Sequence, residues 1–391
     1  FIKTIVFVYY TMCDRNHKQI IALLDQPGNQ FCADCGSKDL QYGSYNLGVF
    51  LCTTCATFHQ KIGTHVSKVK WNDDQVEGMK SLGNSEAKKK YEKHCPIFYR
   101  KPSPDDPVIL LEQWIRAKYE RLEFIHVDKQ KYNTGSMEDN LLVKKRRDDS
   151  NYAPKRFVLS QENGVLSIYS NEVGLKRTEN INSTSKIEHL PCTSKNEPGR
   201  TLCNFTFIEE GVTRHVFVTH ENGEVLIDWY MAIRYAKLLT LRRAYPTASE
   251  AELLPYLTKD FEMEGWVSKT GPHENDAYRK RWVTIDGRKL MYHLNPLDEM
   301  PRGEIFIGHS SEGYNIREGA SNLTKEMGLV FSLVTPERTF VFSVATSSER
   351  NKWMSVIGRV IATPLGTQDF QCRALLDPSK SRASRHSWFH F

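Results

Sequence analysis

Four cysteines near the N-terminus are the residues whose type and spacing could most clearly do chemistry. Cys32 and Cys35 form one C-x2-C pair, and Cys52 and Cys55 form a second pair after sixteen intervening residues. Two residues between thiolates let both sulfurs reach one ion from a single turn, and two such turns complete the tetrahedron that Zn2+ prefers. Since sulfur fills all four positions, we expect one structural Zn2+ ion with no open position for water chemistry.

Other residues around the cysteines narrow the role of this metal site. His59 and His65 are surplus to the four ligands, and we expect packing or a hydrogen bond for each. The spacing alone would also suit a DNA-binding finger of a nuclear protein. Such fingers are followed by a dense basic tail, whereas residues 64–84 mix both charges in a helical pattern. We therefore expect no nucleic-acid partner and keep DNA binding as a distant alternative.

Composition describes an ordinary multidomain protein of a reducing compartment. The chain has 391 residues, 40% of them hydrophobic, and a net charge of +6. The cysteines number nine, and the five outside the two pairs are scattered, which is unlike a disulfide framework. The apolar run before Met12 is too short to span a bilayer and lacks a signal-peptide cleavage site. We expect a cytoplasmic protein whose natural start is Met12.

The residues around the cysteines resemble the zinc finger of the Arf GTPase-activating proteins (Arf GAPs). The matching points are the cysteine spacing, "NLG" at 46–48, "IGTHVSKVK" at 62–70, "GN" at 83–84 and "WIRAKYERLEF" at 114–124. The subgroup with dual pleckstrin-homology (PH) domains, the centaurin-alpha type, is the most similar, over most of residues 13–361. One departure is Tyr42-Gly43-Ser44, where the family usually has Trp-Ala-Ser.

A second departure bears on mechanism. The family has His-Arg after the fourth cysteine, and this chain has His59-Gln60. The resemblance makes position 60 that of the catalytic arginine finger, which is worth about 10³–10⁵ in GTPase rate. Glutamine carries no charge, and Lys61 points about 100° away on a helix. Three interpretations stay open: a retained Arf contact with most catalysis lost, compensation by Lys61 or another residue, and an error in the sequence.

Residues 138–236 and 264–361 look like two copies of one design. Each has a basic first hairpin, several further alternating strands and a closing helix with one tryptophan, Trp229 in the first and Trp353 in the second. About 100 residues of antiparallel strand followed by one amphipathic helix resemble the PH fold. The resemblance implies binding of phosphoinositides, either PI(3,4,5)P3 or PI(4,5)P2.

The basic residues of the two first hairpins are the predicted headgroup ligands. Basic side chains on adjacent strands can surround clustered phosphates, and PH domains often add a tyrosine hydroxyl from the third strand. A solvated basic hairpin is the alternative for each copy. The predicted ligands are Lys144, Lys145, Arg147, Lys155, Arg156 and Tyr169 in the first copy, and Lys269, Arg279, Arg281 and Tyr292 in the second.

These patterns predict a multidomain α+β protein, with a small helical four-cysteine module followed by two PH-like β-barrels, each capped by a C-terminal helix. The expected boundaries are 13–130 for the Arf GAP-like module, 136–237 and 263–362 for the PH domains, 238–262 for a linker and 363–391 for a disordered tail. The implied function is regulation of an Arf-family GTPase by a protein recruited to the plasma membrane. The alternative is a membrane-binding scaffold without GAP activity.

Overall fold

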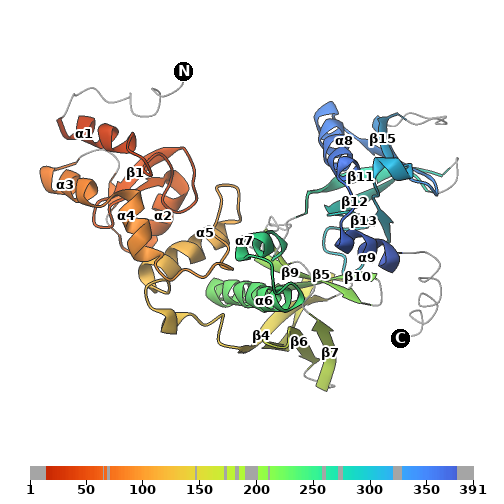
Figure 1. Ribbon diagram of the computed structural model, residues 1–391, viewed down its shortest axis with the longest axis horizontal. Coiled ribbons are helices and arrows are strands. Elements are labelled where there is room, and N and C mark those ends of the chain that lie inside the picture. Colours follow the sequence, from red (N-terminus) through yellow and green to blue (C-terminus); the bar gives the residue numbers. More distant parts are fainter. Residues whose placement is uncertain are drawn as a thin grey trace.

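A computed structural model of the chain describes residues 15–64, 66–67, 71–145, 148–170, 174–180, 185–189, 201–209, 212–257, 261–271, 276–319 and 328–376. Three modules follow one another, which we call the finger, the first barrel and the second barrel. Figure 1 shows the finger and the second barrel at opposite ends, with the first barrel between them. In these ranges no helix combines the length and the apolar composition that crossing a bilayer requires.

The finger is a small antiparallel sheet, in the order β2-β1-β3, surrounded by helices. Asn72 and Gln75 form a reciprocal capping box that starts one of these helices, α3. Its elements are α1 (Arg15–Leu24), β1 (Leu40–Ser44), β2 (Val49–Cys52), α2 (Thr53–Lys61), β3 (Val66–Ser67), α3 (Asp73–Ser81), α4 (Gly83–Tyr91), α5 (Val108–Ile115), the π-helical turn η1 (Arg116–Glu120) and the 3-10 turn η2 (Val127–Lys129).

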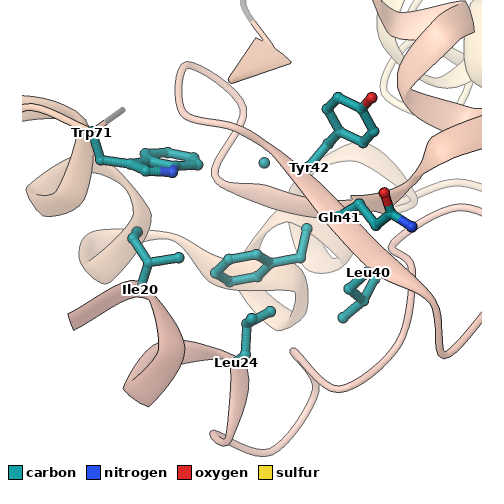
Figure 2. A pocket seen from close by; sticks show the side chains of 8 residues that line it. Ile20, Leu24, Leu40, Gln41, Tyr42 and Trp71 are labelled. Atoms are coloured by element: carbon teal, nitrogen blue, oxygen red, sulfur yellow. The ribbon is translucent and has the colours of Figure 1, made fainter. Parts of the chain in front are cut away.

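A shallow apolar pocket lies between α1 and β1 of the finger (Figure 2). The absence of a side chain at Gly43 makes room for Trp71, because a Cβ there would lie 2.6 Å from the indole. The lining consists of Ile20, Leu24, Leu40, Gln41, Tyr42, Gly43, Phe50 and Trp71. This lining contains no carboxylate, amine, imidazole or thiol, so the pocket is not a candidate for the chemistry of the finger.

The first barrel is a seven-stranded antiparallel sheet closed by a long helix. Alternate residues of its strands are buried, such as Leu141 and Phe157, and Trp229 of the helix packs edge-on against Phe157 at 5.8 Å. Its elements are β4 (Ser136–Lys145), β5 (Asp148–Ser160), β6 (Val165–Ser170), β7 (Gly174–Asn180), β8 (Ser185–His189), β9 (Thr201–Glu209), β10 (Val212–Thr219) and α6 (Gly223–Ala244). α6 thus continues past the expected boundary at residue 237.

The second barrel repeats this plan. Its strand order, β14-β13-β12-β11-β17-β16-β15, matches β7-β6-β5-β4-β10-β9-β8 position by position. Trp353 of its helix is buried in the core, as the helical spacing predicts. After α7 (Glu250–Leu253) and the 3-10 turn η3 (Leu254–Tyr256) come β11 (Met263–Lys269), β12 (Arg279–Asp286), β13 (Lys289–His293), β14 (Gly303–Phe306), η4 (Ser310–Glu312), β15 (Asn315–Glu318), β16 (Leu329–Val334), β17 (Thr339–Val344) and α8 (Ser347–Ala362). The expected fold class is confirmed.

The segment after the second barrel corrects one expectation. Residues 363–391 were predicted to be disordered, but Thr367–Leu376 form a helix, α9. The buried Arg288 explains this order, because it donates hydrogen bonds to the carbonyls of Val360 and Pro364 and pairs with Asp369 at 2.9 Å. Residues 377–391 lie outside the described part of the chain.

The finger and the first barrel share one hydrophobic core. The buried Arg234 of α6 donates a hydrogen bond to the carbonyl of Phe98 in the finger, with Nε and O 2.6 Å apart. Arg100 of the finger donates to the hydroxyl of Tyr230 at 3.0 Å, and the rings of Phe98 and Tyr235 lie 4.8 Å apart. These contacts join the two modules into one packed unit.

The two barrels also meet at a specific junction. The backbone N–H of His215 in β10 donates to the carbonyl of Glu299, at 2.7 Å, and Lys289 Nζ donates to Thr213 Oγ1 at 2.6 Å. The buried rings of His215 and His293 lie 5.3 Å apart, one from each barrel. These contacts join β10 of the first barrel to β13 of the second barrel and to the segment between β13 and β14.

Candidate functional site

The four predicted metal ligands come together at one point of the finger. The sulfurs of Cys32, Cys35, Cys52 and Cys55 all lie within 4.8 Å of one another, and all four residues are buried. Sulfurs that bind one Zn2+ at about 2.3 Å are about 3.8 Å apart in a tetrahedron, and the sulfurs of Cys35 and Cys52 are 3.6 Å apart. The donor set and its size therefore fit a tetrahedral Zn2+ ion.

Local structure explains why these sulfurs converge. The first pair lies in a turn in which the N–H of Gly36 donates to the carbonyl of Cys32, and Gly36 has a φ of +74°. Cys52 ends β2 and caps α2, and Cys55 lies in the first turn of that helix. The bond from Ala33 N to the carbonyl of Phe50, at 3.0 Å, ties the turn to the strand. The two half-sites are thus fixed by backbone contacts.

A buried ionic network lies beside the metal site, and the sequence analysis missed it. Asp34 accepts a hydrogen bond from His59 Nε2 at 2.8 Å, and Lys118 Nζ lies 3.2 Å from the other carboxylate oxygen. Lys118 is also paired with Glu92 at 2.9 Å, and the hydroxyl of Tyr119 donates to Asp34 at 3.1 Å. The side chains of His59, Asp34, Lys118 and Glu92 are each at most 7% exposed, so the network must be nearly complete to be tolerated.

The charges of this network support one another. Burial alone would raise the pKa of Asp34, but the Lys118 ammonium and the bond from His59 together lower it. Burial alone would lower the pKa of Lys118, but Tyr119, Asp34 and Glu92 raise it well above its ordinary value. Both groups are therefore charged at neutral pH. The hydrogen-bonding role predicted for His59 is confirmed, and that of His65 lies outside the described residues.

Gln60, the residue at the predicted arginine position, is exposed on α2. Its backbone carbonyl accepts a hydrogen bond from the N–H of Gly63 at 3.1 Å, which any residue type could do. Lys61 is directed toward a different neighbour, because its ammonium lies 4.9 Å from the ring centroid of Phe58. The helix thus presents residue 60 to solvent while His59, one position earlier, is fully buried.

Three basic residues gather in the second barrel. Lys269 is 8% exposed, and its ammonium lies 4.8 Å from the ring centroid of Tyr292 and 5.5 Å from that of Phe340. Burial, and then the positive charges of Arg338 and Arg281, lower the pKa of Lys269 to about 8, and the carboxylate of Asp276 offsets only part of this effect. Cations that repel one another in a half-buried place favour a bound anion, which would offset the repulsion.

Arg338 was not among the predicted residues, and strand pairing explains its position. It lies in the turn between β16 and β17, and β17 pairs with β11 through the Lys269–Phe342 and Ser268–Ser343 positions. The sequence separation from Lys269 hid this proximity. Arg279 stands opposite Lys269 on β12 and is exposed.

Strand register divides the residues predicted for the first barrel into two faces. Lys155 stands opposite the buried Leu141, just as Arg281 stands opposite the buried Val267 in the second barrel. Lys155 is therefore the counterpart of Arg281. The position that corresponds to Lys269 is held by Val143, which stands opposite Ala153.

Arg156 and Tyr169 lie on the other face of this sheet. They stand opposite each other in register, the guanidinium lies 5.0 Å from the ring centroid, and Arg156 Nε pairs with Glu138 at 2.6 Å. Tyr292, in contrast, stands opposite the buried Val283, so the two tyrosines are not equivalent. Lys144 stands opposite Tyr152, while the side chain of Lys145 and all of Arg147 lie outside the described part.

Comparisons with known proteins agree with this architecture. Residues 17–128 match the ArfGap family, described as a GTPase activating protein for Arf, and residues 261–362 match the PH domain family. The Arf-GAP with dual PH domain-containing protein 2 of Mus musculus is 37% identical over 366 residues, which cover 90% of this chain and 94% of the relative. The Homo sapiens protein of that name is 36% identical with the same coverage.

A shorter match concerns the finger alone. The stromal membrane-associated protein 1 of Mus musculus is 36% identical over 118 residues, which cover 28% of this chain and 26% of the relative. The two long matches span nearly the whole of both chains. The chain therefore belongs to the family of Arf GTPase-activating proteins with dual PH domains.

Proposed function

We propose that this protein is a phosphoinositide-recruited regulator of an Arf-family GTPase whose finger keeps the Arf contact but is a weak activator. The observation that carries the proposal is the exposed, uncharged Gln60 on an otherwise intact α2, next to a complete four-cysteine cluster. Zn2+ held by the four sulfurs would lock the turn before β1 to the start of α2. The finger would then be a rigid surface rather than a catalytic metal site.

The weak activity follows from charge. Negative charge on the transferred phosphoryl group of GTP needs a cation in the transition state, and a guanidinium supplies it together with a fork of donors. Gln60 can donate one hydrogen bond but brings no charge. Lys61 is an inadequate replacement because its ammonium is placed over Phe58.

The second barrel is the stronger candidate for the phosphoinositide headgroup. Lys269, Arg281 and Arg338 provide three cations that act on one another, and the ring of Tyr292 lies 4.8 Å from the Lys269 ammonium. The first barrel has Lys155 at the position of Arg281 but Val143 at that of Lys269. We expect PI(3,4,5)P3 or PI(4,5)P2 at the plasma membrane to be the ligand, with the first barrel contributing a weaker contact. Because the barrels are packed together, two contacts would add through effective concentration.

The decisive experiment measures GTP hydrolysis by membrane-bound Arf on vesicles with and without PI(3,4,5)P3. Gln60→Arg should raise the rate by at least about 10² relative to the unaltered protein. Thr57→Arg, which adds the same charge to another exposed position of α2, is the matched control and should not raise it. Gln60→Lys separates charge from the forked geometry of arginine and should give an intermediate gain.

Two results would contradict the proposal. Hydrolysis by the unaltered protein that already equals that of arginine-bearing relatives would show that another residue supplies the charge. No gain in Gln60→Arg, together with no binding of Arf loaded with a nonhydrolysable GTP analogue, would favour the second candidate, a membrane-binding scaffold. That candidate is kept because position 60 lacks the catalytic charge while the fold around it is complete.

A further inference from the structure

Two tryptophans of the second barrel lie on the outer wall of β11 and β12. Trp266 is 39% exposed, and Trp282 stands opposite it in register, with the ring centroids 5.6 Å apart. Among the described residues, the core of this barrel is formed by the opposite face of the sheet, and neither tryptophan belongs to it. A large aromatic side chain with this exposure and no core role indicates an interaction surface.

A cation accompanies the exposed indole. The ammonium of Lys280 lies 4.6 Å from the ring centroid of Trp266, and Lys280 is exposed. The stem of a lysine can lie along an aromatic ring while its charged end stays in water. Lys280 thus places a positive charge beside the amphipathic ring of Trp266, which is complementary to an anionic lipid surface, while the exposed Glu264 lies two positions before Trp266 on the same face.

The position of this wall relative to the headgroup site is fixed by strand register. Val267 pairs with Arg281, and the next pair along the hairpin is Trp266 with Trp282. Neighbouring residues of a strand are about 3.3 Å apart. If the turn of the hairpin points end-on at the membrane, Trp266 lies one position farther from that turn than Arg281, on the other face of the same hairpin, so both side chains can reach the headgroup region together.

The first barrel does not repeat this surface. The positions that correspond to Trp266 and Trp282 are occupied by Asn140 and Arg156, which stand opposite each other, and Arg156 is paired with Glu138. The pair of tryptophans is thus a feature of the second barrel in the described part of the chain, although Tyr169, with the Arg156 guanidinium 5.0 Å from its ring centroid, lies on the same face of the first barrel. This pair is not a requirement of the shared fold.

We propose that Trp266 and Lys280 form a second membrane contact, which binds the headgroup region of an anionic bilayer while the basic residues inside the barrel bind a phosphoinositide. Tryptophan favours this depth because its ring is apolar and its N–H can reach water. Lys280 adds attraction to anionic lipids. The inference rests on the proposed phosphoinositide function of this barrel.

The test uses the full chain and two probes. Sedimentation with phosphatidylcholine–phosphatidylserine vesicles that contain PI(3,4,5)P3 reports on both contacts, and calorimetric titration with soluble inositol 1,3,4,5-tetrakisphosphate reports on the headgroup site alone. Trp266→Ala should lower vesicle affinity by at least about tenfold, because roughly 100 Å² of exposed indole is no longer transferred from water. Its affinity for the soluble headgroup should stay unchanged. Lys280→Gln should lower vesicle affinity by about fivefold, and less at high salt.

The control is Phe370→Ala. The side chain of Phe370 is 54% exposed, more than that of Trp266, but it lies on α9, which packs beside the edge strand β14 and not beside β11. It should leave vesicle affinity unchanged. Quenching of tryptophan fluorescence by brominated lipids should fall in Trp266→Phe relative to the unaltered protein.

The outcomes separate this inference from the function on which it rests. Unchanged vesicle affinity in Trp266→Ala, or an equal loss in both assays, would overturn the membrane contact. An equal loss would mean that Trp266 merely supports the headgroup site. If the unaltered protein binds neither the soluble headgroup nor the vesicles, the phosphoinositide function itself fails.

Discussion

Replacing Asp228 by asparagine should make the junction between the finger and the first barrel more stable at neutral pH. Asp228 lies on α6 and is 6% exposed. Burial, and then the carboxylate of Glu123 in the finger, raise its pKa from 3.8 to about 7, and Arg121 offsets only part of this effect. Oε2 of Glu123 is buried and, among the described residues, has no hydrogen-bond partner. The junction thus holds an excess of negative charge.

The sign of the pH dependence follows from the raised pKa. The folded state binds the proton of Asp228 more tightly than the unfolded state, so the stabilisation is complete below about pH 4 and is lost as the pH rises through 7. The difference between 3.8 and about 7 corresponds to about 4 kcal/mol in the free energy of unfolding. Asparagine keeps the shape of the protonated acid without the charge, so Asp228→Asn should recover at least about 1 kcal/mol at pH 8 and little at pH 5.

The assay is thermal unfolding of the full chain at several pH values between 5 and 8. Glu224→Gln is the matched control on the same helix, because Glu224 pairs with Lys131 at 2.9 Å and its pKa is lowered. That variant should be less stable than the unaltered protein, and the difference should grow as the pH rises. A melting temperature of Asp228→Asn that is lower than that of the unaltered protein at pH 8, or a pH slope that does not change, would refute the reasoning.

Three further predictions concern the metal, the lipid site and the barrel junction. Cys55→Ser should remove the metal, and it should lower the melting temperature of the first barrel as well as that of the finger because the two modules share one core. An undiminished zinc content by elemental analysis would contradict this. Arg281→Ala should weaken binding to PI(3,4,5)P3 vesicles more than Arg156→Ala, which removes a side chain on the outer wall; the reverse order would show that register does not define the site. Burial lowers the pKa of His293 from 6.5 to about 4, so the junction of the barrels should weaken as the pH falls below 6.5. Small-angle scattering should therefore show expansion of the unaltered protein by pH 5, and His293→Gln should not show it.

Features with a local cause could be predicted from the sequence. The four metal ligands were found because each pair of cysteines occupies one turn. The barrels were found because the alternation of apolar and polar residues in a strand, and the helical spacing of apolar residues, each extend over only a few neighbouring residues. The order of α9 was missed because it depends on Arg288, which is far from the helix in the chain and has no local pattern.

The face of a strand on which a residue lies was harder to predict. A change of one residue in register moves a side chain to the other face of a sheet, and Lys155 and Arg156 are adjacent in the sequence. The pairing of Lys155 with the buried Leu141 decides which of them is the counterpart of Arg281. The ionic network was missed for another reason. Asp34 and Lys118 are 84 positions apart in the sequence, so no local pattern connects them.

The contrast between two neighbouring residues of α2 indicates what the change at position 60 costs. The side chain of His59 is fully buried and bonded to one carboxylate oxygen of Asp34, while Lys118 pairs with the other, so a substitution there would leave a buried, charged oxygen without its hydrogen bond. Gln60 is exposed, and glutamine and arginine have similar helix propensity, so the exchange should change stability by less than about 0.5 kcal/mol. The fold therefore tolerates either residue, and under the proposed function the exchange removes only a positive charge at the surface of the finger. A stable finger with intact metal ligands and no charge at this position is what a docking module with little catalytic activity requires.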